Sequence, residues 1–336
     1  MSMLGSLPYV QPVVAGGTIY IHADGTISPL EVPISNIDDV TYTLIGTIYD
    51  SIVIERSNII VDGARYTVQG FGIGEGLRLY GVNNVTIKNT NIKDFTYSIY
   101  LDLTSDSVIS GNNISANSFG GIELHDSSNN VISGNNIKAN EWYGIGLYYS
   151  SNNLIEKNNI TYNYNGIRFD YSPNNTIYQN NLTHNFCGMG ISNSSNNSIF
   201  HNNFVSNTNH VYCGSSIDAW DDGYPSGGNY WSDYNGTDLY SGIFQNETAG
   251  DGIGDTPHVV CEDNQDNYPL IKSYVFLLGD VNRDRLVNIF DISMVGQAFG
   301  SHSGSERWNP LADLDRNEVI NIIDITLVAM DYGKTA

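Results

Sequence analysis

The middle of the chain is built from one repeating unit of 22 or 23 residues. Six copies of its most regular block start at residues 76, 98, 121, 144, 166 and 188, as GLRLYG, SIYLDL, GIELHD, GIGLYY, GIRFDY and GMGISN. A second block follows in four copies, as NNVISGNNI, NNLIEKNNI, NNTIYQNNL and NNSIFHNNF. Apolar residues alternate with polar ones inside each run, which is the period of a strand and not of a helix. Three short strands per unit, stacked unit upon unit, predict an all-β fold, the parallel β-helix.

The alternation assigns one side of every strand to the core. Like residues would then stack along the helix axis at the inter-strand spacing of about 4.8 Å. The first strand of each unit contributes two such columns, and the other two strands contribute one each. The columns are Leu77, Ile99, Ile122, Ile145, Ile167, Met189; Leu79, Leu101, Leu124, Leu147, Phe169, Ile191; Ile132, Ile155, Ile177, Ile199; and Ile114, Ile137, Ile160, Leu182, Phe204.

Paired asparagines recur at the corners between the strands. Asn accepts left-handed backbone geometry, and its amide can bond the equivalent Asn one coil away. We therefore expect two asparagine ladders. They comprise Asn112, Asn135, Asn158, Asn180, Asn202 and, one residue further on, Asn113, Asn136, Asn159, Asn181, Asn203.

Motifs on both sides of the repeat carry a family resemblance. GNYWSDYNG (228–236), GDGIGDTPHVV (250–260) and DNYPL (266–270) follow the repeat, while TIYIHADGTISP and NIIVDGARYTVQG precede it. Over roughly residues 17–275 the chain resembles NosD-like right-handed parallel β-helix surface proteins, a type common in archaea. The resemblance implies a right-handed coil and a role in carbohydrate binding or sugar hydrolysis. Some members process copper, but no His, Met or Cys cluster in this sequence has ligand spacing.

A duplicated acidic segment follows, in residues 279–336. GDVNRDRLVNIFDISMVGQAFG and ADLDRNEVINIIDITLVAMDYG share the ligand spacing of an EF-hand calcium loop, with Asp closing each loop at position 12. Each loop runs into an amphipathic segment that we expect to be a helix ending at Gly300 or Gly333. The predicted Ca²⁺ ligands are Asp280, Asn282, Asp284, Leu286, Asn288, Asp291 and Asp313, Asp315, Asn317, Val319, Asn321, Asp324, with Leu286 and Val319 acting through their carbonyls.

The duplication resembles a dockerin, the small calcium-folded module that binds a cohesin. The resemblance implies two Ca²⁺ ions, a small all-α module and a partner that bears a cohesin domain. Loop positions 10 and 11, where dockerins tend to contact their partner, are apolar here, so we expect an apolar contact surface. These residues are Ile289, Phe290, Ile322 and Ile323.

Two further features concern calcium. Loop position 6, where EF-hands favour Gly for a sharp turn, is Arg285 in one loop and Glu318 in the other, which predicts a lower affinity. A further Ca²⁺ candidate lies around Asp251 and Asp255 in the stretch DGIGD. The alternative is a series of Asp-Gly turns in a long capping loop.

The division into domains follows from these patterns. We expect an N-terminal cap and first coils over residues 1–75, and regular coils over 76–212. A C-terminal cap of the β-helix would occupy 213–278, and the dockerin-like module 279–336.

Charge and cysteine content restrict the partners and the compartment. Asp and Glu outnumber Lys and Arg by 36 to 14, for a net charge of -22, which argues against nucleic-acid binding. No apolar run reaches the 18 or so residues of a membrane span. The N-terminus lacks a signal-peptide pattern, and we expect an extracellular or cell-surface protein whose leader is absent from this sequence. Cys187, Cys213 and Cys261 allow one disulfide plus one free thiol, or three buried thiols.

The outward positions of the first strand form a continuous polar face. One column runs Arg78, Tyr100, Glu123, Gly146, Arg168, Gly190 and the next runs Tyr80, Asp102, His125, Tyr148, Asp170, Ser192. The catalytic candidates are His125, Asp102 and Glu123, because Asp102 could orient the imidazole. The glycan-binding candidates are Tyr100, Tyr148, Arg168 and Asp170, and Tyr148 or Arg168 could hold an acidic sugar.

The same face leaves binding and catalysis open. Acid–base groups beside a cation suit a polysaccharide lyase or epimerase. Hydrolysis needs two carboxylates at a set separation, and Asp102 and Asp170 would lie about 14 Å apart, which is too far. The NTD, GHG, RIK and DPH triplets of β-helix enzymes are absent.

We therefore favour a non-catalytic role. The chain is expected to be a secreted or cell-surface scaffold that binds glycan or adheres, docked to a cohesin-bearing partner through calcium. The alternative is a polysaccharide lyase, epimerase or hydrolase targeted by the same module.

Overall fold

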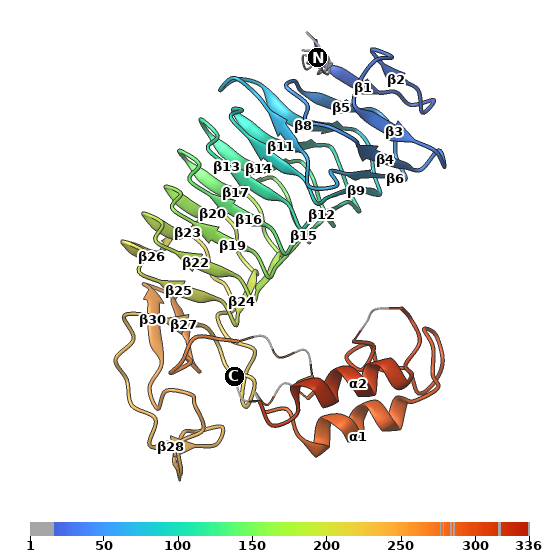
Figure 1. Cartoon of the computed structure of the whole chain (residues 1–336). Coiled ribbons are helices and arrows are strands. Elements are labelled where there is room, and N and C mark those ends of the chain that lie inside the picture. The colour runs from blue at the N-terminus through green and yellow to red at the C-terminus, as the bar shows by residue number, and fades with distance from the viewer. Residues whose placement is uncertain are drawn as a thin grey trace, which may run out of the picture.

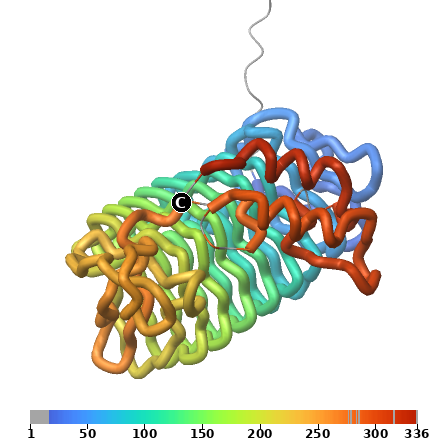
Figure 2. The backbone as a smooth tube through the Cα atoms, turned by 90° about the horizontal axis from the view of Figure 1, so that it is seen from below, coloured from blue at the N-terminus to red at the C-terminus, as the bar shows by residue number. Residues whose placement is uncertain are grey.

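A computed structural model describes residues 17–275, 277, 279–282, 284, 286–314 and 317–334. Its larger part is a parallel β-helix, in which the chain passes through three sheets in each coil (Figure 1). Figure 2 shows the successive coils of the backbone lying side by side along the axis. A small helical module follows the β-helix, as the repeat pattern and the duplicated acidic segment predict.

Three sheets form the sides of the β-helix. The first consists of β2 (Ile27–Ser28), β1 (Ile19–Ile21), β5 (Ile52–Ile54), β8 (Glu75–Tyr80), β11 (Tyr97–Asp102), β14 (Gly120–His125), β17 (Tyr143–Tyr148), β20 (Asn165–Asp170), β23 (Cys187–Ser192) and β26 (Asn209–Gly214). The second consists of β3 (Ile34–Asn36), β4 (Thr41–Leu44), β6 (Ile59–Asp62), β9 (Val85–Lys88), β12 (Val108–Ser110), β15 (Val131–Ser133), β18 (Leu154–Glu156), β21 (Thr176–Tyr178) and β24 (Ser198–Phe200). The third consists of β7 (Thr67–Gln69), β10 (Asn91–Lys93), β13 (Asn113–Ser115), β16 (Asn136–Lys138), β19 (Asn159–Thr161), β22 (Asn181–Thr183), β25 (Asn203–Val205) and β27 (Tyr230–Trp231).

The core is the stack of like residues that the alternation predicts. Every residue of the four predicted columns is 0% exposed. The register pairs equivalent positions of neighbouring coils, for example Ile122 with Ile145 and Leu124 with Leu147. Burying such a side chain contributes roughly 1.5–3 kcal/mol, so the repeat supplies its own driving force coil by coil.

Glycine in the recurrent Gly-Ile pair has a steric cause. A Cβ on Gly144 would lie 2.7 Å from the carbonyl oxygen of Gly166 in the next coil. A Cβ on Gly121 would lie 2.5 Å from the carbonyl oxygen of Gly144. Glycine therefore recurs where the chain turns into the first sheet, because neighbouring coils approach closely there, and the small Ser98 takes the position in one coil.

Both predicted asparagine ladders are present. In the buried one, Asn135 Nδ2 donates to Asn158 Oδ1 at 3.0 Å and its backbone N–H donates to the same oxygen at 2.9 Å. In the neighbouring ladder, which is more exposed, Asn136 Nδ2 donates to Asn113 Oδ1 at 2.8 Å. The expected left-handed backbone is wrong for these residues. It belongs to the residue before each buried Asn, such as Lys157 with φ 56°, since that residue takes the turn while the Asn aligns its amide with the stack.

Three further ladders occupy the other corners. Each joins a backbone N–H to the side-chain oxygen of the equivalent residue one coil on. The three ladders are Asn130, Asn153, Asn175, Asn197, Asp218; Asn117, Asn140, Asn163, Asn185, Asn207; and Ser127, Ser150, Ser172, Ser194, Ser216. Asparagine amides and serine hydroxyls thus accept most of the hydrogen bonds from buried backbone N–H groups at the corners. This explains why the chain is polar but carries few charges.

The last coil is closed by aromatic residues and a disulfide. Trp231 stacks on Phe204 at 4.4 Å between ring centroids. Cys213 in β26 is bonded to Cys261, while Cys187 is a buried free thiol, which resolves the alternatives that the sequence leaves open. The closing loops also contain two short hairpins. Their strands are β28 (Tyr240–Ser241) with β29 (Glu247–Thr248) and β30 (His258–Cys261) with β31 (Asn264–Asp266).

The C-terminal module consists of two packed helices and their loops. Helix α1 spans Ile289–Ala298 and helix α2 spans Ile322–Asp331. The chain leaves each helix through a glycine in left-handed conformation, Gly300 at φ 76° and Gly333 at φ 82°, close to the ends that the sequence predicts. Within the described residues, no helix is long and apolar enough to cross a membrane.

Candidate functional site

Glu123 is buried, although it occupies an outward strand position. It is 6% exposed, because the Tyr143 side chain covers it and donates a hydrogen bond to its carboxylate. Burial raises the pKa of Glu123, while the hydrogen bond from Tyr143 acts to lower it. Gly120 and Gly146 leave room for that ring, since a Cβ on either would lie 2.4 or 2.6 Å from it. Glu123 is thus shielded from a ligand and supports the floor of the face.

His125 is the last residue of β14 and is partly exposed. Its Nδ1 is 2.9 Å from the Asp126 carboxylate and 4.0 Å from that of Asp102. Asp126, rather than Asp102, is therefore the closer acidic partner. It follows the strand in a left-handed conformation, with φ 46°, which brings its side chain beside the imidazole.

A row of aromatic rings borders the first sheet where each coil enters it. We define this aromatic row as Phe119, Trp142, Tyr164 and Phe186. The successive centroid separations are 5.6, 5.8 and 4.7 Å. Trp142, Tyr164 and Phe186 are 51, 47 and 46% exposed. Large flat apolar surfaces therefore remain open to solvent along one edge of the face.

A groove of about 580 Å³ runs between the aromatic row and an ion pair on the sheet. Arg168 Nε donates to Asp170 Oδ2 at 2.7 Å, and Nη2 donates to Oδ1 at 2.6 Å. The hydrogen bond to Asp170 raises the pKa of Arg168, and burial opposes that rise. The groove is lined by Phe119, Trp142, Tyr143, Tyr148, Tyr164, Asn165, Arg168, Asp170, Phe186, Cys187, Asn209, Val211 and Tyr212.

The structure brings together some of the predicted face residues. Tyr148, Arg168 and Asp170 line the groove. Tyr100 lies outside it, tilted against Tyr97 at 5.4 Å between centroids. His125 and Asp102 are also outside the lining. The binding candidates thus converge in part, while the catalytic candidates lie beside the groove or beneath its floor.

The aromatic row was not among the predicted residues. Its members stand one residue before the strands and recur at steps of 23, 22 and 22 residues, from 119 to 142, 164 and 186. Extending the aligned block by two positions would have revealed the column. Its role depends on the corner geometry, which turns these rings along the sheet edge.

The first predicted calcium loop folds around Asp291, its last predicted ligand. Asp291 is 0% exposed, and its Oδ1 accepts from the backbone N–H groups of Val281 and Asn282 at 2.8 and 3.1 Å. Its Oδ2 accepts from the backbone N–H of Asn288 at 2.8 Å. The described ligand residues of this loop are Asp280, Asn282, Asp284, Leu286, Asn288 and Asp291.

The second loop repeats this arrangement. Asp324 is 0% exposed, with Oδ1 accepting from the Leu314 N–H and Oδ2 from the Asn321 N–H, both at 2.8 Å. Asp315 lies outside the described residues, as does Arg285 of the first loop. The described ligand residues are Asp313, Asn317, Val319, Asn321 and Asp324.

Predicted ligands of both loops also begin the helices. Asn288 and Asn321 are the N-caps of α1 and α2, and the position-12 aspartates complete a capping box in each helix. The fold therefore holds the last ligands in place through helix capping. The four predicted partner residues follow directly in the first turns and are exposed. Ile289, Phe290, Ile322 and Ile323 are 59, 67, 63 and 50% exposed.

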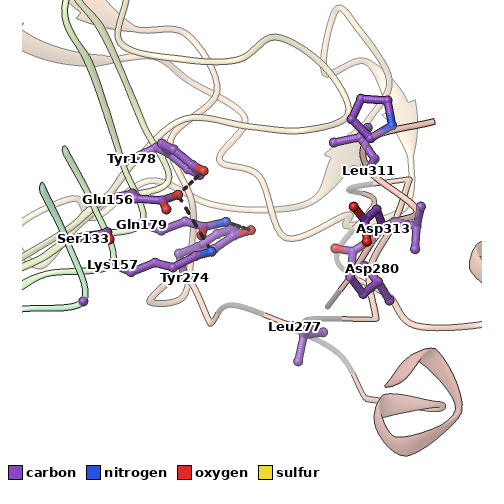
Figure 3. Close-up of a pocket in the computed structure, with 14 residues that line it drawn as sticks. Ser133, Glu156, Lys157, Tyr178, Gln179, Tyr274, Leu277, Asp280, Leu311 and Asp313 are labelled. Atoms are coloured by element: carbon purple, nitrogen blue, oxygen red, sulfur yellow. Dashed lines mark hydrogen bonds and ion pairs between the residues drawn. The ribbon is translucent and has the colours of Figure 1, made fainter. Parts of the chain in front are cut away.

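A second pocket, of about 340 Å³, lies between the module and the β-helix (Figure 3). Asp280 and Asp313, the position-1 residues of both loops, line one side. Tyr178, Glu156 and Tyr274 line the other, with the Tyr178 hydroxyl bonded to Glu156. Both calcium loops thus begin at a pocket beside the β-helix.

The Asp251 and Asp255 carboxylates accept hydrogen bonds within the capping loops. Asp255 accepts from the backbone N–H groups of Leu239 and Tyr240 at 3.0 Å and from Thr237 Oγ1 at 2.9 Å. Asp251 Oδ1 accepts from the backbone of the same stretch, at Ile253. The partners of Asp255 thus lie in residues 237–240, while Asp251 bonds within its own turn.

Family models match two parts of the chain. The model described as "Periplasmic copper-binding protein (NosD)" matches residues 35–236, and the "Dockerin type I domain" matches residues 278–331. In the described part of the chain, no three His, Cys, Asp or Glu side chains are grouped to hold a metal ion. The predicted calcium ligands also include asparagine side chains, backbone carbonyl oxygens and Asp315, which lies outside the described residues.

Solved structures share the β-helix architecture at low identity. The periplasmic alginate epimerase AlgG matches at 20% identity and a TM-score of 0.41, covering 51% of this chain and 38% of that one. DFA-IIIase from Arthrobacter chlorophenolicus A6 matches at 16% identity and a TM-score of 0.35, covering 60% of this chain and 46% of that one. The chain thus spans less than half of either protein, and the likeness concerns the fold alone. No curated protein sequence matches the chain.

Proposed function

Because the chain belongs to the NosD family and carries a type I dockerin domain, we propose that it is an extracellular glycan-binding scaffold docked to a cohesin-bearing partner. The groove beside the aromatic row carries the glycan part of this proposal. Exposed rings such as Trp142 and Tyr164 offer flat apolar surfaces to the C–H face of a sugar ring. The Arg168–Asp170 pair and Tyr148 offer hydrogen bonds to its hydroxyls.

The docking part of the proposal rests on the C-terminal module. Its loops would hold two Ca²⁺ ions through carboxylate, amide and carbonyl oxygens, the ligands that this hard cation prefers. The first-turn residues Phe290 and Ile323 are large, apolar and open to solvent. Such residues at the centre of a contact are suited to anchor a protein partner.

The disulfide supports a location outside the reducing cytosol. Cys213 and Cys261 close a loop across 48 residues in the cap of the β-helix. Disulfides of this structural kind persist in secreted and surface proteins. The bond is thus consistent with an extracellular scaffold.

Glycan binding is tested with Trp142→Ala in the full chain. Truncating a central aromatic anchor is expected to weaken oligosaccharide binding at least about tenfold. Phe71→Ala is the matched control, because Phe71 is 80% exposed and lies outside the groove. Calorimetric titration with neutral and acidic oligosaccharides measures both variants, and equal affinities would contradict the proposal.

Docking is tested by titrating a cohesin domain into the full chain. Binding is expected with calcium and not after chelation, because the loops order the helix starts. Phe290→Asp combined with Ile323→Asp should abolish the complex, since charged groups would have to be buried in an apolar contact. Unchanged binding of that double variant would remove the proposed contact surface.

A second candidate function is an enzyme acting on the bound glycan. The observation that favours it is the exposed His125, whose Nδ1 lies 2.9 Å from Asp126 and which could transfer a proton. Turnover of a polysaccharide that is lost in His125→Ala and kept in Phe71→Ala would establish it. Binding without released or unsaturated product leaves the scaffold as the function.

A further inference from the structure

The charges of the groove indicate which glycans it accepts. Of the side chains that line it, two are formally charged, Arg168 and Asp170. They form a side-by-side pair through two hydrogen bonds of 2.7 and 2.6 Å. The cation that would attract an acidic sugar is therefore already neutralised.

The free donors of the guanidinium are few. Its Nη2 group bonds both Asp170 and, at 3.2 Å, Ser192 Oγ, while its Nε is held by Asp170. Nη1 has no hydrogen-bond partner among the described residues and lies beside Gly190, where a Cβ would approach it to 3.1 Å. Glycine thus leaves space beside Nη1, the amino group of Arg168 that does not bond Asp170.

The surroundings add negative charge, not positive. Strand β14, which β17 separates from β20, carries Glu123, and Asp102 and Asp126 lie beside His125 on the same face. A uronate carboxylate placed at Nη1 would meet a guanidinium whose charge Asp170 already offsets, and the two carboxylates would repel each other across it. A hydroxyl in that place would accept from Nη1 without adding a second negative charge beside the ion pair.

We infer that the groove selects neutral polysaccharides and discriminates against uronate-containing ones, with Asp170 as the residue that sets this preference. The inference rests on the proposed glycan binding and specifies its substrate class. Arg168 then acts as a hydroxyl donor held in position by Asp170. The exposed rings of Trp142 and Tyr164 would pack against the unsubstituted sugar rings.

The test uses the full chain and oligosaccharides of matched length. The neutral probes are cello-, xylo- and manno-oligosaccharides, and the acidic probes are oligogalacturonate and oligomeric alginate. A neutral probe is expected to bind at least about tenfold more tightly than any acidic one, a difference of about 1.4 kcal/mol. Asp170→Asn removes the competing charge and should reduce that ratio by raising affinity for the acidic probes.

Asp106→Asn is the control for the Asp170 variant. It makes the same chemical change at an exposed corner outside the groove, where Asn accepts the left-handed backbone of φ 54°. It should leave the ratio unchanged. Arg168→Gln is a second variant, which should weaken neutral probes without creating affinity for acidic ones.

The outcomes separate the two levels of the proposal. Tighter binding of acidic probes by the unaltered chain would overturn the neutral-glycan inference and keep the glycan-binding function. An unchanged ratio in a folded Asp170→Asn protein would overturn the role of Asp170. Absence of binding to every probe would overturn the proposed function, and this inference with it.

Discussion

In the β-helix, the buried polar side chains are mostly amides and hydroxyls that bond the equivalent residue one coil away. In the C-terminal module, the buried polar side chains include the carboxylates of Asp291 and Asp324, which accept backbone N–H groups of their own loops. The first arrangement needs only another copy of itself, whereas the second gathers negative charge that a cation would offset. Repetition and ion binding are thus two ways to bury polar groups in one chain.

The largest expected effect tests the ladder. Asn158 is 1% exposed and accepts from Asn135 while its own amide donates to Asn180 and to backbone carbonyls. Asn158→Ala leaves several of these buried groups without partners and should lower the free energy of unfolding by about 4 kcal/mol. Urea denaturation followed by circular dichroism measures it.

The neighbouring residue supplies the control for the ladder. Asn159 makes the same type of bond, to Asn136 at 3.0 Å, on the exposed side of the corner. Asn159→Ala should change the free energy of unfolding by no more than about 0.5 kcal/mol, because water can replace its partner. Equal losses in the two variants would show that burial does not distinguish the ladders.

The end of the buried ladder gives a pH dependence. Asp266 receives the Asn229 backbone N–H at 2.7 Å, and burial raises its pKa to about 7. Above pH 4 the unfolded chain loses this proton while the folded chain keeps it, so the stability of the β-helix should fall as pH rises towards 7 and then level off. The expected loss is about 3 kcal/mol.

Asp266→Asn should flatten that part of the stability curve. Asp218 ends a second ladder, and burial raises its pKa to about 6, so it contributes in the same direction. Urea unfolding at several pH values between these limits measures both. Stability that rises over this range in the unaltered chain would contradict the assignment.

Calcium removal tests how the C-terminal module compensates its buried carboxylates. Chelation should destabilise the C-terminal module by about 2.7 kcal/mol for each Ca²⁺ ion lost, relative to calcium at a hundredfold excess over its dissociation constant. The β-helix transition should not move, since its ladders need no ion. Calorimetric scans of the full chain with and without chelator distinguish the two transitions, and equal shifts of both would mean that the domains are coupled.

The smallest expected effect concerns one loop residue. Glu318 stands at position 6 of the second loop with φ 66°, where a side chain is strained. Glu318→Gly should stabilise the module by about 0.5 kcal/mol, because relief of strain outweighs the added freedom of the unfolded chain. Denaturation in calcium measures it, with Glu306→Gly as the control in an exposed loop position.

Much of the molecule was predictable because its interactions repeat. The alternation of Ile122, Glu123 and Leu124 shows which side of a strand is buried, and the 22-residue period shows what stacks on it. The calcium loops were recognisable because their ligands lie within twelve consecutive positions. The burial of Glu123 was not predictable, because it depends on the Tyr143 side chain of the next coil. That ring covers the Glu123 carboxylate in the space left by Gly120 and Gly146.

The sequence by itself determined the coil, its core columns and the first two asparagine ladders, and it predicts the ligand order of the calcium loops. These follow from periodicity and local spacing, which can be read along the sequence. Tertiary structure alone decided that Arg168 is neutralised by Asp170, that Asp126 lies nearest His125 and that Cys213 pairs with Cys261. Such pairings depend on side-chain direction at strands and corners and on the path of the capping loops, which a linear pattern does not record.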